Sequence, residues 1–244
     1  MRRFSETRLR WQLLLVWAIV ALSTTWLPEK GLAQGTANTL TAAEKTAGWR
    51  LLFDGKSLDG WRGYKGETLP AGWRIVDGTF TKDTPVTDII SKEQFDNFEL
   101  VVDWKIGEAG NSGLFYRGTE EYDRVYWSAP EFQLLDDLKA ADGKLRISSA
   151  GALMALYESP AGHLKAVGDW NTARIIVNGN HVEHWLNGVK LVEAEMGSAD
   201  WNTRVKESKF GKWPNFGLAK KGHLAIQGDH AGVLAFRNIK IRPL

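Results

Sequence analysis

Polar side chains interrupt a short apolar segment, EFQLLDD, which begins at Glu131. If this segment is a strand, Glu131 and Gln133 lie on one face, and Phe132 and Leu134 lie on the other, because successive side chains of a strand alternate. A carboxylate can take a proton from a reacting carbon or accept a hydrogen bond from a hydroxyl group, and an amide can donate or accept. The pair indicates an acid–base site or a polar binding surface, and the sequence leaves both open.

A second segment, GNSGLFYRG, mixes polar and apolar residues in the same way. Alternation puts Asn111, Gly113, Phe115 and Arg117 on one face. Any one of these polar residues can simply point into water from the outer face of a β-sandwich. As a set, however, Arg, Glu, Gln and Asn are side chains that hydrogen-bond sugar hydroxyl groups. The set therefore favours a binding face.

The histidines, at positions 163, 181, 184, 223 and 230, form no compact metal-binding motif. His184 shares its predicted strand face with Val182 and Leu186, so both a buried structural role and a functional role remain open. His230 lies in IQGDHAG, a glycine-bounded loop, beside Asp229. A histidine on such a loop can reach a cleft and exchange a proton near neutral pH. The sequence therefore favours His230 as the histidine nearest to the chemistry.

Two further polar positions border predicted strands. Arg237 falls on the predicted face of Ala235 and Ile239, where an arginine needs a carboxylate partner or a ligand. Trp170 and Asn171 stand directly before a strand, where a tryptophan can line a cleft or fill the core. We expect the three strongest candidates and one glutamine to converge on one cleft at the concave face of a sheet: Arg117, Glu131, His230 and Gln133.

Composition excludes several classes of function. The chain of 244 residues contains no cysteine, so thiolate catalysis and cysteine-bound zinc are excluded. The motifs GxSxG, the P-loop and the dinucleotide-binding glycine pattern are absent. Residues 1–33 carry five basic and two acidic residues, and without them the formal net charge falls from +2 to −1. This charge gives no support for binding to nucleic acid.

The first residues predict export. MRRFSETRLR is basic, WQLLLVWAIVALSTTWL is apolar, and small residues follow near Ala33, which is the order of a secretory signal peptide. The apolar run approaches spanning length, so an uncleaved membrane anchor remains the alternative. Residues 34–47 are predicted to be a polar linker with one short helix, in which Thr41 and Glu44 form a capping box. We expect a periplasmic or extracellular protein, without stable membrane insertion if the signal is cleaved.

Residues 48–244 are predicted to form a single all-β domain. FELVVDWKI alternates apolar and polar residues from Phe98 to Ile106, which is typical of a half-buried strand. Two Asn-Gly pairs, at positions 178 and 187, divide residues 172–195 into a three-stranded meander, because Asn-Gly suits tight hairpin turns. The last segment, GVLAFRNIKIRPL, is predicted to be a strand that ends near Pro243. Many short strands with regular turns favour an antiparallel β-sandwich or jelly roll.

The segments together resemble a known family. GWRLLFDGKSLDGWRGY, GNSGLFYRG, EFQLLDD, GDWNTARIIVNGNHVEHWLNGVKL and GHLAIQGDHAGVLAFRNIKIRPL occur in this order. From about Gly48 to its end the chain is similar to the bacterial 3-keto-disaccharide hydrolase family, which has 3-keto-glucoside 1,2-lyase and 3-keto-2-hydroxy-glucal hydratase members. The resemblance implies a concanavalin-like jelly roll.

The resemblance also implies site residues and a reaction. Combined with the strand patterns above, it leads us to predict catalytic roles for Glu131, His230 and Arg117, with the choice between base and hydroxyl acceptor left open for Glu131. We predict substrate binding by Asn111, Gln133, Asp136, Tyr157, Trp170, Asn171, His184, Gln227 and Arg237. The substrate would be a glycoside already oxidised to a ketone at C3, cleaved by proton removal at C2, elimination and rehydration. Met154 stands where similar sequences often have tyrosine, which leaves the role of nearby Tyr157 open.

Alternatives remain beside this interpretation. A non-catalytic carbohydrate-binding module would share the fold, the tryptophans and the polar face. A conventional jelly-roll glycosidase would need two carboxylates at catalytic spacing. No cofactor is evident from the sequence, although a divalent metal held by histidines and carboxylates is possible. The oligomeric state is not indicated.

Overall fold

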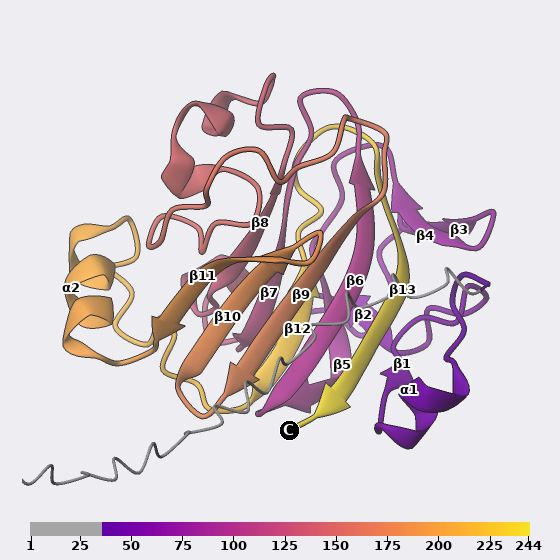
Figure 1. Cartoon of the computed structure of the whole chain (residues 1–244), viewed down its shortest axis with the longest axis horizontal. Helices are drawn as coiled ribbons and strands as arrows, with labels where there is room; N and C mark the ends of the chain where they lie inside the picture. Colours follow the sequence, from indigo (N-terminus) through magenta and orange to yellow (C-terminus); the bar gives the residue numbers. More distant parts are fainter. Residues whose placement is uncertain (1–35) are drawn as a thin grey trace, which may run out of the picture. The chain divides into compact units, whose positions relative to one another are not determined.

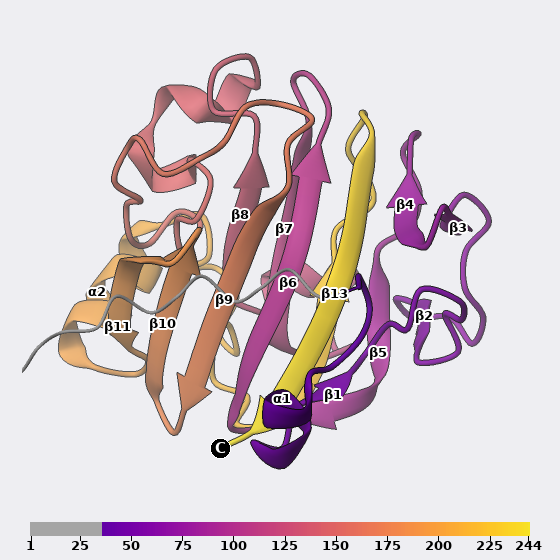
Figure 2. The ribbon, with the colours of Figure 1, turned by 45° about the vertical axis from the view of Figure 1, so that its right-hand side comes forward.

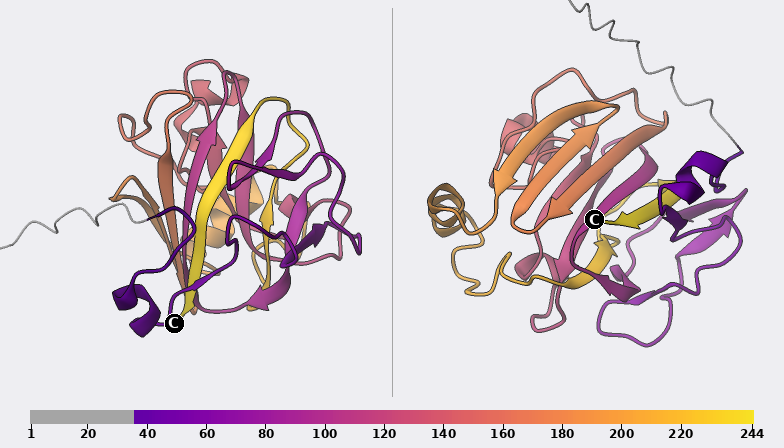
Figure 3. Two further views of the ribbon diagram at one scale, coloured as in Figure 1. Left: turned by 90° about the vertical axis from the view of Figure 1, so that its right-hand side faces the viewer. Right: turned by 60° about the horizontal axis from the view of Figure 1, so that its bottom comes forward.

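The computed structural model describes residues 36–244, which form two packed β-sheets with long connecting loops (Figure 1). Every pair of neighbouring strands in these sheets is antiparallel. The left panel of Figure 3 views the two layers from the side. The predicted antiparallel β-sandwich of the jelly-roll type is therefore confirmed. The predicted signal peptide lies outside the described residues.

The larger sheet contains eight strands among the described residues. Their order is β11 (Val189–Glu195), β10 (His181–Leu186), β9 (Asn171–Asn178), β6 (Phe98–Ile106), β13 (Leu234–Pro243), β4 (Thr79–Lys82) and β3 (Arg74–Val76), and β1 (Arg50–Leu51) also pairs with β13. The predicted meander of residues 172–195 is confirmed as β9, β10 and β11. Asn187 at φ 51° and Gly188 at φ 85° form the second hairpin turn.

The smaller sheet carries five strands. Their order is β2 (Trp61–Gly63), β5 (Ile89–Phe95), β12 (Gly222–Ile226), β7 (Asn111–Gly118) and β8 (Glu131–Leu135). β8 is thus an edge strand, and it is the predicted strand EFQLL. The backbone at its free edge forms hydrogen bonds with residues 151–154 of the loop that follows it.

A layer of large aromatic side chains fills the space between the sheets. Phe80, Trp104 and Phe236 come from the larger sheet, and Tyr116 and Phe132 come from the smaller sheet; all five are fully buried. The alternation predicted for Phe98–Ile106 is confirmed, because Phe98, Leu100, Val102, Trp104 and Ile106 all belong to this core. Burial of these rings is the main contribution that holds the sheets together.

The face predicted for Arg237 is wrong, because β13 contains a bulge. Its register against β6 shifts between Arg237 and Lys240, and Asn238 adopts φ 51°. The extra residue reverses the alternation. Ile239 therefore points into the core with Phe236, whereas Arg237 lies opposite Asp103 of β6 and points away from the core.

The helices are short and peripheral. α1 (Ala42–Thr46) has the predicted capping box between Thr41 and Glu44. The N-cap of α2 (Ala199–Glu207) is Ser198, whose hydroxyl accepts from the Trp201 amide. Figures 1 and 2 show α1 near β1 and β13, and α2 beside β11. Three 3-10 helices lie in loops: η1 (Val125–Trp127), η2 (Ala141–Lys144) and η3 (Arg146–Ser148). Within residues 36–244, no helix is long and apolar enough to cross a membrane.

Loops cover part of the outer face of the smaller sheet. Ile90, Phe115 and Ala225 point away from the main core and pack against Val125 and Ala129 of the loop that precedes β8. This second, smaller core fixes that loop on the sheet. The part of the face that it leaves free lies over β7 and β8, which is where the polar residues singled out from the sequence are found.

Candidate active site

A glycine on β7 makes room for the Glu131 side chain on the outer face of the smaller sheet. In the register of β7 and β8, Phe115 lies opposite Glu131, and Gly113 lies opposite Gln133. A Cβ atom placed on Gly113 would lie 2.2 Å from Oε1 of Glu131. Any larger residue at position 113 would collide with this carboxyl group. The carboxyl group therefore lies against the bare backbone of β7.

Burial changes the acidity of Glu131. The residue is 5% exposed, and burial raises the pKa of its carboxyl group from 4.5 to about 8. The positive charge of Lys209 opposes this shift, and the negative charges of Asp88 and Asp229 add to it. A carboxyl group with a pKa close to the working pH is suited to general acid–base chemistry.

Glu131 lies at a cavity of about 220 Å³ that gathers residues from distant parts of the chain. The cavity is lined by Asn111, Tyr126, Glu131, Gln133, Asp142, Met154, Lys209, Gln227, Asp229 and His230. β7 and β8 form its base, the loops that hold Tyr126, Asp142, Met154 and Lys209 form its walls, and the loop between β12 and β13 brings Asp229 and His230.

Several buried oxygens at this cavity have no hydrogen-bond partner within the described part of the protein. They are Oε1 of Gln133, Oε1 of Gln227 and Oδ1 of Asp229. Gln133 is 1% exposed and Gln227 is 7% exposed. Buried polar atoms are nearly always paired, so unpaired oxygens that line a cavity indicate a place for a hydrogen-bonding ligand.

The loop that carries His230 is held from beneath by two buried ionisable groups. The amine of Lys82 donates to the carbonyl oxygens of His230 at 2.6 Å and Gly232 at 3.4 Å. At the other end, a carboxylate oxygen of Asp88 accepts from the amide of Gly228 at 2.8 Å. These bonds fix the backbone of the loop. The His230 ring itself stays 44% exposed, with Nε2 at 3.8 Å from the Asp229 carboxylate.

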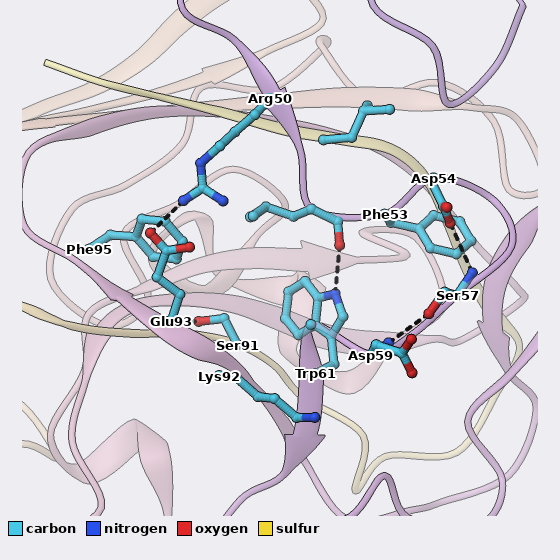
Figure 4. A pocket seen from close by; sticks show the side chains of 13 residues that line it. Arg50, Phe53, Asp54, Ser57, Asp59, Trp61, Ser91, Lys92, Glu93 and Phe95 are labelled. Atoms are coloured by element: carbon cyan, nitrogen blue, oxygen red, sulfur yellow. Dashed lines mark hydrogen bonds and ion pairs between the residues drawn. The ribbon is translucent and has the colours of Figure 1, made fainter.

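A larger cavity, of about 460 Å³, lies at the opposite edge of the smaller sheet (Figure 4). Several of its polar groups are already paired. Arg50 contacts Glu93 at 2.6 Å, and the Trp61 indole donates to the Leu52 carbonyl at 3.0 Å. Asp54 accepts from two backbone amides of its own turn. The smaller cavity is the better candidate because it has unpaired buried oxygens and a carboxyl group of raised pKa, whereas the larger cavity has neither.

The expected convergence is right for Glu131, Gln133 and His230, and wrong for Arg117. The Arg117 guanidinium is buried at the far end of β7, where it donates to the carbonyls of Asp96 and Gly179 and to the side chain of Asn97. Arg117 also adopts φ 54°, which departs from regular strand geometry. These contacts tie the β5–β6 turn to the β9–β10 turn, which is a structural role.

Arg117→Met is expected to lower the free energy of unfolding by about 2–4 kcal/mol, because buried carbonyl oxygens lose a charged donor. Urea unfolding measures this change. Arg74→Met is the matched control, since Arg74 is exposed and pairs with Asp83 on the surface. A variant at position 117 with unchanged stability but no catalytic turnover would contradict the structural role.

Three other sequence-predicted residues are held by structural contacts away from the cavity. His184 is fully buried, bonded to the Tyr116 hydroxyl and the Gly151 carbonyl, and burial lowers its pKa to about 4. Asn171 accepts from the Lys165 amide at 3.0 Å. Asp136 accepts from three backbone amides of the loops beside it. None of the three lines the cavity.

Arg237, Trp170 and Tyr157 also lie apart from the cavity. The Arg237 guanidinium lies 4.2 Å from the Trp170 ring centroid and pairs with Asp103 at 3.5 Å, on the outer face of the larger sheet. The Tyr157 hydroxyl donates to Asp200 at 2.7 Å. Asn111 and Gln227, by contrast, do line the cavity beside Glu131.

Sequence reasoning missed Tyr126, Asp142 and Lys209, which form much of the cavity wall. All three lie in loops or 3-10 helices, where no periodicity marks which side chains point inward. Lys209 follows α2 in a lysine-rich stretch that contains no signal to distinguish it from its neighbours. Only the packing of the loops on the sheet selects it.

One group of side chains in the described part of the chain has the spacing of a metal site. His181, Glu183 and Glu193 bring ligand atoms within 4.8 Å of one another on the outer face of the larger sheet. The Lys190 amine already pairs with both glutamates. The group lies on the other sheet from the cavity, so the possibility of a divalent metal in the reaction stays a prediction.

The fold and the site together define a jelly-roll β-sandwich protein with a small polar cavity that contains a buried carboxyl group of raised pKa. The sequence profile of the family described as 3-keto-alpha-glucoside-1,2-lyase-like domain matches residues 48–242. The chain belongs to this family, and the predicted resemblance is confirmed.

Relatives agree with this assignment. The chain is 32% identical over 247 positions to a 3-keto-disaccharide hydrolase of Bacteroides thetaiotaomicron, covering 88% of this chain and 85% of the relative. It is similar to a crystal structure of a candidate glycosyl hydrolase of Parabacteroides distasonis, with 35% identity, a TM-score of 0.80 and coverage of 86% and 100% of the two chains. A second such structure from that organism has 27% identity and a TM-score of 0.64, covering 80% and 99%.

Proposed function

We propose that this protein is an exported enzyme that cleaves the glycosidic bond of glycosides oxidised to a ketone at C3. Family membership and the hydrolase from Bacteroides thetaiotaomicron support glycoside cleavage. The observation that carries the proposal is Glu131, a buried carboxyl group with a pKa of about 8 that lines a small polar cavity. The order of residues 1–33 supports export.

The chemistry of such a substrate sets what the protein must supply. A ketone at C3 acidifies the C2 proton, because the carbanion left at C2 is an enolate. The electron pair then expels the oxygen at C1, which leaves as an alcohol once it has gained a proton. Water adds across the new C1–C2 double bond, with oxygen to C1 and hydrogen to C2. The net result is hydrolysis with the C3 ketone retained.

Three cavity residues suit these steps. Glu131 is the base that takes the C2 proton, since a carboxylate of raised pKa is a stronger base than an ordinary one. His230, on its fixed but exposed loop, donates a proton to the leaving oxygen at C1. Lys209 supplies the positive charge that stabilises the enolate oxygen.

The size of the cavity limits what it can enclose. Its volume of about 220 Å³ lies below the roughly 300–1,000 Å³ typical of pockets for drug-sized ligands. One sugar ring, the oxidised one, would therefore occupy the cavity, and the leaving group would extend outside it. Gln133 and Gln227 are placed to bind hydroxyl groups of that ring, because each has a buried oxygen without a partner among the described residues.

Incubation of the purified protein with a 3-keto-glucoside and with its unoxidised parent tests the proposal. We expect release of the leaving group from the oxidised compound only, because elimination requires the ketone. A non-catalytic binding module would bind sugar without releasing anything. Equal cleavage of both compounds would identify a conventional glycosidase and overturn the proposal.

A further inference from the structure

A chain of hydrogen bonds runs along the base of the cavity from Asp142 through Asn111 to Gln133. Nδ2 of Asn111 donates to Oδ2 of Asp142 at 2.9 Å. Nε2 of Gln133 then donates to Oδ1 of Asn111 at 3.1 Å. Oε1 of Gln133 stands at the end of the chain, buried at the cavity and without a partner in the described residues.

We infer that this chain fixes Gln133 as an obligatory hydrogen-bond acceptor and thereby makes the cavity specific for a sugar hydroxyl group at this point. The inference deepens the proposed function and rests on it for the identity of the substrate. It assigns Gln133 as the residue that contacts the hydroxyl group. Asn111 and Asp142 are positioning residues that set the polarity of that contact.

The direction of the chain follows from its first member. An ionised carboxylate can only accept hydrogen bonds, so Asn111 must present its NH₂ group to Asp142. The Asn111 oxygen then faces Gln133. Because this oxygen can only accept, Gln133 must donate to it through its NH₂ group. With that group committed, the Gln133 oxygen is left for the cavity. One exposed carboxylate thus decides the orientation of two amides that would otherwise be free to flip.

The consequence is a preference about substrate orientation. A hydroxyl group donates to the Gln133 oxygen, whereas a ketone oxygen accepts only and would be repelled there. The C3 ketone must therefore point elsewhere in the cavity, and Lys209 is the side chain in the lining that can only donate. The two residues together define which edge of the oxidised ring faces which wall.

Reversal of the chain tests the inference. In Asp142→Asn, the new amide can donate to Asn111, which allows Asn111 to turn and Gln133 to present its NH₂ group to the cavity. Gln133→Glu alone places carboxylates on both sides of Asn111. The single NH₂ group of Asn111 can donate to only one of these carboxylates, so the other loses its hydrogen bond. The double variant restores a consistent chain, because Asn111 donates to the new carboxylate at position 133 in place of Asp142 and an acceptor faces the cavity again.

We expect kcat/KM for a 3-keto-glucoside to fall about 10- to 100-fold in each single variant, because the substrate hydroxyl group loses its acceptor at position 133. In the double variant the acceptor is restored, and we expect kcat/KM to recover at least about 10-fold. Monofluoro analogues at C4 and C6 provide the second readout. Fluorine cannot donate, so the analogue at the contacted position is penalised by the wild-type protein and less so by Asp142→Asn.

A parallel measurement keeps this test separate from that of the proposed function. Calorimetric binding of methyl glucoside, which lacks the ketone, reports hydroxyl recognition without cleavage, and the same loss and rescue are expected. If the wild type cleaves the 3-keto-glucoside while the single variants match it, the proposed function stands and this inference is wrong. If no cleavage occurs but the affinities follow the pattern, the inference stands and the function is wrong. The inference is also wrong if both single variants lose kcat/KM and the double variant does not recover it.

Discussion

Glu131→Gln is expected to lower kcat for a 3-keto-glucoside by about 10²–10⁴-fold, because general base catalysis contributes a factor of this size. Glutamine nearly matches glutamate in shape, so it can occupy the space over Gly113. It cannot take a proton from C2. Steady-state kinetics, corrected for spontaneous elimination of the substrate in buffer, measures the change.

Glu207→Gln is the matched control. Glu207 is an exposed carboxylate in the last turn of α2 and does not line the cavity. We expect this variant to keep wild-type turnover. If Glu131→Gln keeps it as well while folding normally, Glu131 is not the base.

The pH dependence of the wild type gives Glu131 a second test. As a base, it must be ionised in the free enzyme, and its pKa is raised to about 8. We therefore expect the kcat/KM profile to have a rising limb that follows the ionisation of Glu131. If the residual activity of Glu131→Gln keeps the same rising limb, another group is the base.

The same raised pKa predicts a change in stability. Below pH 4.5 the carboxyl group is protonated in both the folded and the unfolded chain, so it does not disfavour folding. Between 4.5 and about 8 the unfolded chain loses this proton while the folded protein retains it, so the contribution to stability declines as pH rises. We therefore expect the melting temperature of Glu131→Gln to increase relative to that of the wild type as the pH rises from 4.5 to about 8.

Lys209→Met is expected to lower kcat by about 10²–10³-fold, which is the usual loss when one group that stabilises a developing oxyanion is removed. Methionine keeps much of the length of the side chain but has no charge. Lys209 also lowers the pKa of Glu131, so its loss should move the rise of the kcat/KM profile to higher pH.

Lys206→Met serves as the control, since Lys206 is exposed on α2 and contributes nothing to the cavity lining. It should behave as the wild type in both measurements. If Lys209→Met moves the pH profile but leaves the plateau of kcat unchanged, Lys209 tunes Glu131 and another group stabilises the enolate.

The sequence by itself determined the sandwich, the meander of residues 172–195, the capping box of α1 and the family. These features leave local patterns in the sequence that can be recognised without knowing which strands pair. Alternation of apolar residues sets the faces of a strand, and Asn-Gly sets a turn. The same alternation places Glu131 and Gln133 on one face of β8.

The tertiary structure decided which polar residues meet. Arg117 of β7 and Gln133 of β8 both lie on faces predicted to be polar. Arg117 is nevertheless buried against the turn at Asp96, whereas Gln133 lines the cavity. A single bulge at Asn238 reversed the face of Arg237. Lys209 and Asp142 reach the cavity through loops, where position depends on packing against the sheet and not on a repeating backbone. Likewise, the raised pKa of Glu131 arises from burial, a property of the assembled fold that no local pattern encodes.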